Sequence, residues 1–310
     1  MTIQQLEYII ALDECRHFVK AAEKCFITQP TLSMMINKLE EELEVKIFDR
    51  TKHPIVPTKE GQELIKLAKA VALQTRFIKE YVAGLKGKLA GDIRIGIIPT
   101  LAPYLVPLFL KEFVKRCPDL KVSMKEMTTP QIIKSIDNGD VDIGVLATPV
   151  NVPSLTEHPL FYEEFYAYAS LDEKLPKKKY LLPKEIKIAH LWLLEEGHCF
   201  RNQVYNLCQL KKQDNSQLNY EAGSIETLIN LVDHSKGITL IPKLAVMNLK
   251  PSQKKHVREF ANPKPVREIS LVVKNNFIRK KILNELKDVI TKCLPAEMVS
   301  SENKKITLID

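Results

Sequence analysis

The residue whose type and surroundings best suit chemistry is Cys199, which follows an acidic turn, Gly197 and His198. An apolar stretch ends at Leu194, and we expect a helix to begin at about Cys199. A thiol at a helix N-terminus, with His198 and Arg201 beside it, has its thiolate stabilised by the helix dipole, free N–H groups and positive charge. A thiolate attacks peroxides and becomes a sulfenic acid. From these residues alone, an inert buried cysteine stays open as the alternative.

The other cysteines lack such surroundings. The six cysteines form no Cys-x-x-Cys pair, which argues against a zinc ribbon or a thioredoxin-type site. No spacing of ligand residues indicates a metal site, and we expect neither a metal nor a cofactor. We expect packing roles, as small buried hydrophobes, for Cys15, Cys25, Cys117 and Cys293.

Two threonines, Thr100 and Thr129, each follow a predicted strand at the point where a helix should begin. As N-caps they would accept hydrogen bonds from free backbone N–H groups. Parallel strands would also bring both hydroxyls to one cleft between two lobes, where a small polar molecule can be held.

The elements that precede these residues begin with three short helices within residues 1–44. Thr28 is the expected N-cap of the third helix, and Pro30 lies in its first turn. Two helices, a tight turn and a third helix with small polar residues outside form a helix-turn-helix, and residues 46–57 follow as a short wing. We expect a DNA-binding surface in which Gln29, Thr31 and Ser33 face base edges. The whole predicted surface comprises Thr28, Gln29, Pro30, Thr31, Ser33, Met34, Lys38 and Arg50, with Thr28, Lys38 and Arg50 on phosphates or the flanking minor groove.

After residue 58 the apolar residues alternate spacings of four and three. Such a heptad pattern predicts a long linker helix over 59–90 that pairs with a second copy, and the alternative is a helix packed on its own domain. The predicted pairing residues are Leu64, Val71, Ile78 and Leu85.

Beyond residue 91 strands and helices alternate, which predicts mostly parallel sheets in two α/β lobes. We place the first lobe at about 91–163 plus 267–295 and the second at about 164–266, within a regulatory domain of 91–310. The tail from residue 297 is polar, and we expect it to be frayed.

Composition sets outer limits on function. Apolar residues at 45% and charged residues at 27% are ordinary for a globular chain, and no apolar run is long enough to span a bilayer. The N-terminus lacks the order of a secretion signal, so we expect a cytoplasmic protein. The net charge of +8 says little about nucleic acid, because residues 1–90 hold 14 basic against 12 acidic residues.

The N-terminal sequence resembles the winged helix-turn-helix of LysR-type transcription regulators. The likeness is carried by Phe18-x-x-Ala21-Ala22, Thr28-Gln29-Pro30-Thr31-Leu32-Ser33, Leu39-Glu40, Phe48-Asp49-Arg50 and Thr58-x-x-Gly61. It implies a regulator that binds double-stranded promoter DNA, contacts RNA polymerase and carries two lobes of periplasmic-binding-protein type. It also implies a homodimer or a dimer of dimers. A transcription regulator is not an enzyme, and a peroxidase would have no need of the helix-turn-helix.

A narrower likeness lies in residues 197–203 with Cys208, which resemble the redox segment of peroxide-sensing members of that family. It implies that hydrogen peroxide oxidises Cys199 and that Cys208 then forms a disulfide with it. Nine residues of one helix span about 13 Å, whereas a disulfide needs Cα atoms within about 7 Å, so the segment must refold. The implied peroxide pocket comprises Thr100, Thr129, His198, Arg201 and Arg267. The alternative is a LysR-type regulator that binds a small metabolite between its lobes.

Overall fold

The computed structural model describes residues 1–85, 89–173, 180–186, 191–209, 220–299 and 305–306. The chain divides into two compact units, Met1–Lys88 and Leu89–Asp310, each with its own hydrophobic core.

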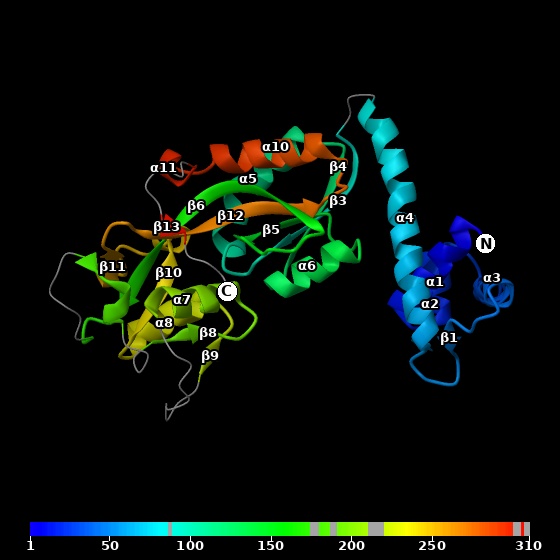
Figure 1. Ribbon diagram of the computed structural model, residues 1–310, viewed down its shortest axis with the longest axis horizontal. Helices are drawn as coiled ribbons and strands as arrows, with labels where there is room; N and C mark the ends of the chain where they lie inside the picture. The colour runs from blue at the N-terminus through cyan, green and yellow to red at the C-terminus, as the bar shows by residue number, and fades with distance from the viewer. Residues whose placement is uncertain (86–88, 174–179, 187–190, 210–219, 300–304, 307–310) are drawn as a thin grey trace. The chain divides into compact units, whose positions relative to one another are not determined.

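The N-terminal unit is a winged helix-turn-helix followed by a long helix (Figure 1). Its elements are α1 (Ile3–Cys15), α2 (Phe18–Lys24), α3 (Gln29–Glu42), β1 (Phe48–Asp49), β2 (Val56–Pro57) and α4 (Lys59–Leu85). The Thr28 hydroxyl accepts a hydrogen bond from the Thr31 N–H at 3.4 Å, so α3 begins where the sequence predicts. β1 and β2 pair antiparallel and form the expected wing.

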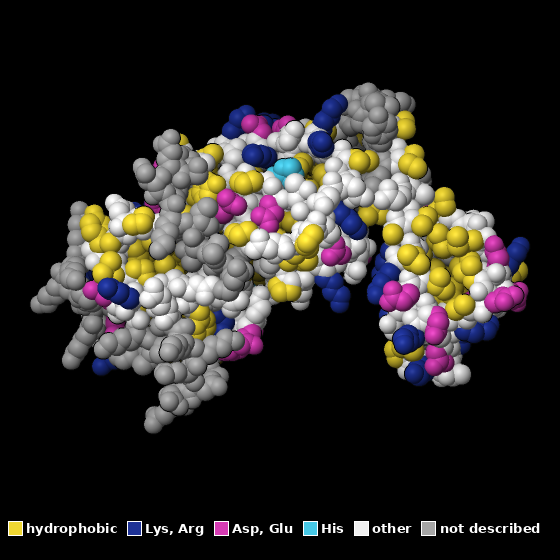
Figure 2. Space-filling view, in the orientation of Figure 1, with side chains coloured by type: hydrophobic (Ala, Val, Ile, Leu, Met, Phe, Trp, Pro, Cys, Tyr) yellow, Lys and Arg dark blue, Asp and Glu magenta, His cyan; other side chains and the backbone are white. Residues whose placement is uncertain are grey.

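The first half of α4 packs on its own domain. Ile65 and Ala68 are buried in the N-terminal core, and Leu64 packs against it. Leu64 therefore packs on its own domain, which is the alternative that the heptad pattern left open. Beyond this point Val71 and Ile78 are 42% and 66% exposed. Figure 2 shows further hydrophobic side chains gathered on one face of the N-terminal unit. The side chain of Leu85 lies outside the described residues.

The C-terminal unit contains a curled mixed sheet in which the described strands follow the order β4-β3-β5-β12-β6-β11-β7. Its strands are β3 (Gly91–Ile97), β4 (Leu120–Glu126), β5 (Ile143–Thr148), β6 (Leu155–Ala169), β7 (Tyr180–Leu181), β10 (Ile238–Pro242), β11 (Val257–Phe260), β12 (Pro265–Lys274) and β13 (Lys305–Ile306). Strands β3, β4 and β5 pair parallel, as do the short strands β7 with β11 and β13 with β12. Strand β6 pairs antiparallel with β10, β11 and β12, and β12 pairs antiparallel with β5. The expectation of mostly parallel sheets is therefore wrong for β6 and β12, whose long pairings are antiparallel.

Strand β6 runs through both halves of this unit. Residues up to Glu164 pair with β12, and residues from Phe165 on pair with β10 and β11. The predicted lobe boundary near Glu163 falls at this change of partner. Strand β12 lies between β5 and β6, so the chain returns to the first lobe after making the second.

Helices cover both faces of the sheet (Figure 1). They are α5 (Ala102–Arg116), α6 (Thr129–Asp137), α7 (Cys199–Cys208), α8 (Ile225–His234), α9 (Lys243–Met247), α10 (Lys280–Lys292) and α11 (Ala296–Val299), with short 3-10 turns at Pro183–Glu185 and Lys254–His256. A small parallel pair, β8 (Leu193–Leu194) and β9 (Glu221–Ala222), lies beside α7 and α8. Residues 189 and 190, within the apolar stretch that ends at Leu194, lie outside the described residues. The tail is not simply frayed, since Ala296–Val299 is helical and Lys305–Ile306 pairs with β12.

Candidate functional site

Helix α7 carries both cysteines of the implied switch, Cys199 as its first residue and Cys208 as its last. Gly197 adopts a φ of +96°, a backbone conformation that glycine tolerates and that turns the chain into the helix. A Cβ at Gly197 would lie 3.8 Å from Thr128 Cγ2 at the start of α6. The turn before Cys199 therefore lies against the first lobe.

The Cys199 thiol lies in a buried environment. Cys199 and its N-cap residue His198 are each 6% exposed, and His198 Nε2 lies 3.6 Å from a Glu195 carboxylate oxygen. Arg201 donates to the Leu194 carbonyl at 2.7 Å and to Glu221 at 2.9 Å. The positive charge that we expected to act on the thiol is thus partly neutralised by Glu221, and Arg201 ties α7 to the strands before and after it.

A buried ion pair lies next to the first turn of α7. Arg267 Nε and Nη2 donate to Glu163 at 2.9 and 2.7 Å, and both side chains are fully buried. Arg267 Nη1 also donates to the Thr100 hydroxyl at 2.9 Å, while Glu163 accepts the Leu244 N–H at 2.9 Å. The guanidinium lies over the Phe200 ring, 5.1 Å from its centroid. Arg267 therefore connects Thr100 with the residue that follows Cys199.

The two threonines do not cap helices as expected. The N-cap residue of α5 is Leu101, because the Thr100 hydroxyl is taken by Arg267. The N-cap residue of α6 is Thr128, one position earlier than predicted, and its N–H donates to Gln131 at 3.0 Å. The hydroxyl of Thr129 is buried and has no hydrogen-bond partner among the described residues. A buried polar atom without a partner costs about 1–3 kcal/mol, so this hydroxyl favours a bound polar molecule.

Cys208 is buried at the opposite end of α7, and burial raises the pKa of its thiol to about 12. Both cysteines are free, and the helical rise separates their Cα atoms by about 13 Å. Their disulfide therefore requires α7 to unwind. The remaining cysteines lie within or against the two hydrophobic cores, as expected for Cys15, Cys25, Cys117 and Cys293.

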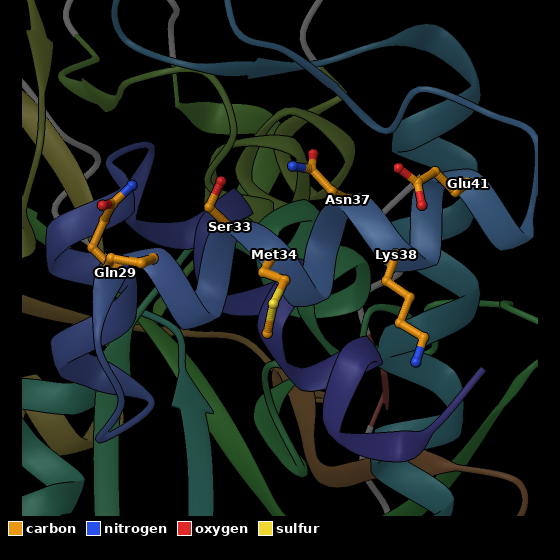
Figure 3. A pocket seen from close by; sticks show the side chains of 7 residues that line it. Gln29, Ser33, Met34, Asn37, Lys38 and Glu41 are labelled. Carbon is orange, nitrogen blue, oxygen red and sulfur yellow. The ribbon is translucent and has the colours of Figure 1, made fainter.

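The candidate DNA-binding surface is the exposed side of α3. Gln29, Ser33, Asn37 and Glu41 recur every four residues along it, and Figure 3 shows their side chains in one row. They line a shallow groove together with Pro30, Met34 and Lys38. Thr31 is partly buried and does not line this groove, because its hydroxyl lies 2.8 Å from that of Thr28.

The wing is fixed to α3 by Glu40, whose side chain is fully buried. Its carboxylate accepts the N–H groups of Ile47 and Phe48 at 2.8 and 3.2 Å. It also pairs with Arg50 at 3.3 Å, and Arg50 in turn donates to Ser33 at 3.4 Å. Arg50, which we predicted on the DNA backbone, is 32% exposed and so presents part of its charge to solvent.

Sequence reasoning gave no structural role to Glu40, Glu163 or Phe200. Glu40 carried a usable signal, because an acid between Leu39 and Leu43 on an apolar helix face needs a buried partner. The sequence around Glu163 carried no such signal, since its partner Arg267 is remote in the sequence. Across the described ranges, no group of three or more His, Cys, Asp or Glu side chains could hold a metal ion. No helix among the described residues is both long and apolar enough to cross a membrane.

The fold and these surfaces define a DNA-binding transcription regulator. Comparison with known families shows to which family of regulators the chain belongs. Residues 3–62 match the bacterial regulatory helix-turn-helix of the lysR family, and residues 86–292 match the LysR substrate binding domain. The chain belongs to the LysR family of transcription regulators.

Within that family its relatives include proteins named for peroxide. It is 34% identical to the hydrogen peroxide-inducible genes activator of Haemophilus influenzae, over 88% of this chain and 90% of that protein. It is also 34% identical to OxyR, a DNA-binding transcriptional dual regulator of Escherichia coli K12, over 88% of this chain and 89% of that protein. A cysteine-to-aspartate variant of full-length OxyR from Pseudomonas aeruginosa matches with a TM-score of 0.78 at 31% identity, covering 95% of this chain and 99% of that one. A cysteine mutant of Corynebacterium glutamicum OxyR with H2O2 bound matches with a TM-score of 0.62 at 27% identity, covering 94% and 92%.

Proposed function

We propose that this regulator senses hydrogen peroxide through Cys199 and controls oxidative-stress promoters in the cytoplasm, where bacterial DNA lies. The observation that carries the proposal is the buried Cys199 at the start of α7, with the start of α6 against the turn that precedes it. The relatives named for peroxide and the H2O2-bound OxyR structure support the same substrate.

The chemistry begins with attack of the Cys199 thiolate on one peroxide oxygen. The O–O bond breaks, the sulfur becomes a sulfenic acid, and the other oxygen leaves as hydroxide, which takes a proton to give water. In the proposed pocket the Thr129 hydroxyl supplies a hydrogen bond to peroxide, and Arg267 holds Thr100 in place. Cys199 is the first residue of α7, and its buried N-cap residue His198 lies beside it.

Cys208 then resolves the sulfenic acid. Its sulfur attacks the Cys199 sulfur, the S–O bond breaks, water leaves, and a disulfide forms. The high pKa of buried Cys208 disfavours its thiolate, so α7 must open before this step. Opening brings the two cysteines within disulfide distance and hydrates the second thiol.

Peptide mapping tests this sequence of events. Treatment with mild peroxide should link Cys199 to Cys208, and the DNA footprint should change with it. Cys199→Ser should lose the response, while Cys208→Ser should trap the sulfenic acid and respond briefly. Cys293→Ser is the matched control and should behave as wild type. A wild-type footprint that switches without this linkage contradicts the disulfide mechanism.

The pocket has its own test. Replacing Thr100 and Thr129 by Val keeps their shape and removes both hydroxyls. We expect the rate of Cys199 oxidation, followed by stopped flow, to fall at least tenfold. An unchanged rate would limit both residues to structural roles.

A small-molecule effector held between the lobes remains the competing function, and the unpartnered Thr129 hydroxyl is compatible with it. The two are separated by one experiment, because a peroxide sensor switches its footprint without any added metabolite. Activation that survives Cys199→Ser in the presence of cell extract would favour the effector.

On promoter DNA we propose that Gln29 and Ser33 contact base edges while Lys38 and Arg50 contact phosphates. The row of side chains along α3 in Figure 3 supports insertion of this face into a major groove. Arg50→Ala and Gln29→Ala should both weaken promoter binding, but only Arg50→Ala should lower its salt dependence.

For assembly we propose that Val71, Ile78 and Leu85 pair the α4 helices of two protomers, and that two such dimers contact RNA polymerase at the promoter. The exposed Val71 and Ile78 support this contact, since apolar side chains on a narrow helix face are typical of pairing helices. Ile78→Lys should yield monomers in sedimentation, whereas Lys66→Glu on the same helix should not.

A further inference from the structure

We propose that Phe200 is a positioning residue whose ring holds the Cys199 end of α7 in the reduced form and opposes disulfide closure. The inference rests on the proposed Cys199–Cys208 switch. It adds the contact that stabilises the reduced form relative to the disulfide.

The Phe200 ring contacts one residue of β6 and one of β12. It stacks on Phe165 with 5.2 Å between centroids and 26° between planes, and the Arg267 guanidinium lies 5.1 Å from its centroid on β12. Phe200 is 2% exposed, so water does not screen either contact. Stacked aromatic pairs and desolvated cation–π contacts are both favourable beyond the burial of their area.

The two neighbours of Phe200 are themselves fixed. Phe165 lies in β6 at the residue where this strand changes partners from β12 to β10. Arg267 is held by two hydrogen bonds to Glu163 and one to the Thr100 hydroxyl. Both neighbours are thus held by contacts that do not involve α7.

Disulfide closure strains this arrangement. The ends of α7 must approach from about 13 Å to within about 7 Å, and Cys199 is bonded directly to Phe200. We infer that closure draws the ring out of its stack, so the stack stabilises only the reduced form. Weakening the stack therefore favours the disulfide. It also holds the Cys199 thiol less firmly in the position where it reacts with peroxide.

The test is a thiol–disulfide equilibrium of the full-length chain with dithiothreitol, read by alkylation of free thiols. In this exchange two electrons pass from the dithiol to the protein disulfide. We expect Phe200→Leu to raise the equilibrium constant for the disulfide about tenfold, which is about 30 mV toward more negative potential. The rate of sulfenic acid formation should fall several-fold in the same variant. A role confined to general stability would not move these two quantities in opposite directions.

Two further variants make the experiment decisive. Phe165→Leu removes the stacking partner but leaves Phe200 in place, so it should shift the potential in the same direction and add little when combined with Phe200→Leu. Phe260→Leu is the control, because Phe260 is 1% exposed in β11 and lies outside the stack; it should lower stability without shifting the potential.

The outcomes distinguish the two proposals. If the disulfide forms and its potential is the same in wild type, Phe200→Leu and Phe165→Leu, the role of Phe200 is refuted alone. If wild type forms no Cys199–Cys208 disulfide, the proposed switch is refuted and this inference with it.

Discussion

Both units of the chain contain a glutamate whose side chain is fully buried and binds an arginine, and the two sites differ in what they connect. Glu40 in the N-terminal unit binds Arg50 and two N–H groups within a short stretch of chain, and Arg50 remains partly exposed. Glu163 in the C-terminal unit binds Arg267 and Leu244, which are remote in sequence, and its ion pair is fully buried. The first site shapes a surface that must stay constant. The second lies beside α7, the helix that unwinds in the proposed switch.

The largest expected effect comes from breaking the remote pair. Glu163→Ala leaves the Arg267 guanidinium buried without a counter-charge, which should cost about 3–5 kcal/mol of unfolding free energy. Urea denaturation of the reduced protein measures it. Glu163→Gln retains an acceptor for the Leu244 N–H and should cost less than Glu163→Ala. A loss of unfolding free energy below about 1 kcal/mol would mean that water solvates the Arg267 guanidinium in the variant.

Removing Glu40 should cost less unfolding free energy than removing Glu163. Glu40→Ala removes the acceptor of two N–H groups, worth about 1–3 kcal/mol, and frees the wing from α3. We expect weaker promoter binding in a gel-shift assay even where the protein remains folded. Glu40→Gln keeps an oxygen acceptor and serves as the control. Equal affinities for Glu40→Ala and wild type would show that the wing does not depend on this contact.

The buried thiol of Cys208 adds a pH dependence to the C-terminal unit. Its pKa rises from an ordinary value of 9.0 to about 12 on folding, so between these values the unfolded chain binds fewer protons than the folded one. Stability from this group is therefore complete below pH 9 and falls by about 1.4 kcal/mol per pH unit above it. Buried Tyr104, Tyr166 and Tyr168, whose pKa values are also raised by burial, act in the same direction at higher pH. The Cys208→Ser variant isolates the thiol, and parallel stability–pH curves for the two proteins would contradict the assignment.

The smallest effect concerns the exposed face of α3. Lys38→Ala should lower the slope of log affinity against log salt by about 1, because one phosphate contact is lost. Lys66→Ala removes the same charge from α4 and should leave the slope unchanged. Identical slopes in all three proteins would place Lys38 away from the phosphates.

The success of the sequence analysis follows this same division between local and remote contacts. The helix-turn-helix, its wing and the cap at Thr28 were predicted correctly because their signals lie within a few residues of one another. The family likeness named the residues around Cys199, and the structure places Cys199 and Cys208 at the two ends of one helix. The cap of α6 was misplaced by one residue, since Thr128 and Thr129 offer equivalent hydroxyls.

Features set by remote contacts could not be predicted. Strand β6 shows no clear alternation, because its two halves pack in different surroundings and it contains Pro159. The partners of Glu163, and the stack around Phe200, are fixed by chain segments that the sequence does not bring together. The heptad pattern likewise could not separate Leu64, which packs on its own domain, from the exposed Ile78.

The position of β12 in the sheet has a consequence for how the protein is made. This strand lies between β5 and β6, yet it is translated after the whole of the second lobe. A ribosome adds about 5–20 residues per second, so for several seconds the nascent chain carries Cys199 without Arg267. Until β12 emerges, Glu163 and Phe200 lack their partner and the thiol-bearing helix lacks its full enclosure. The surroundings of Cys199 are therefore complete only at the end of synthesis. Until then Cys199 and Cys208 lack the enclosure of the folded protein, and they stay reduced only through the reducing power of the cell.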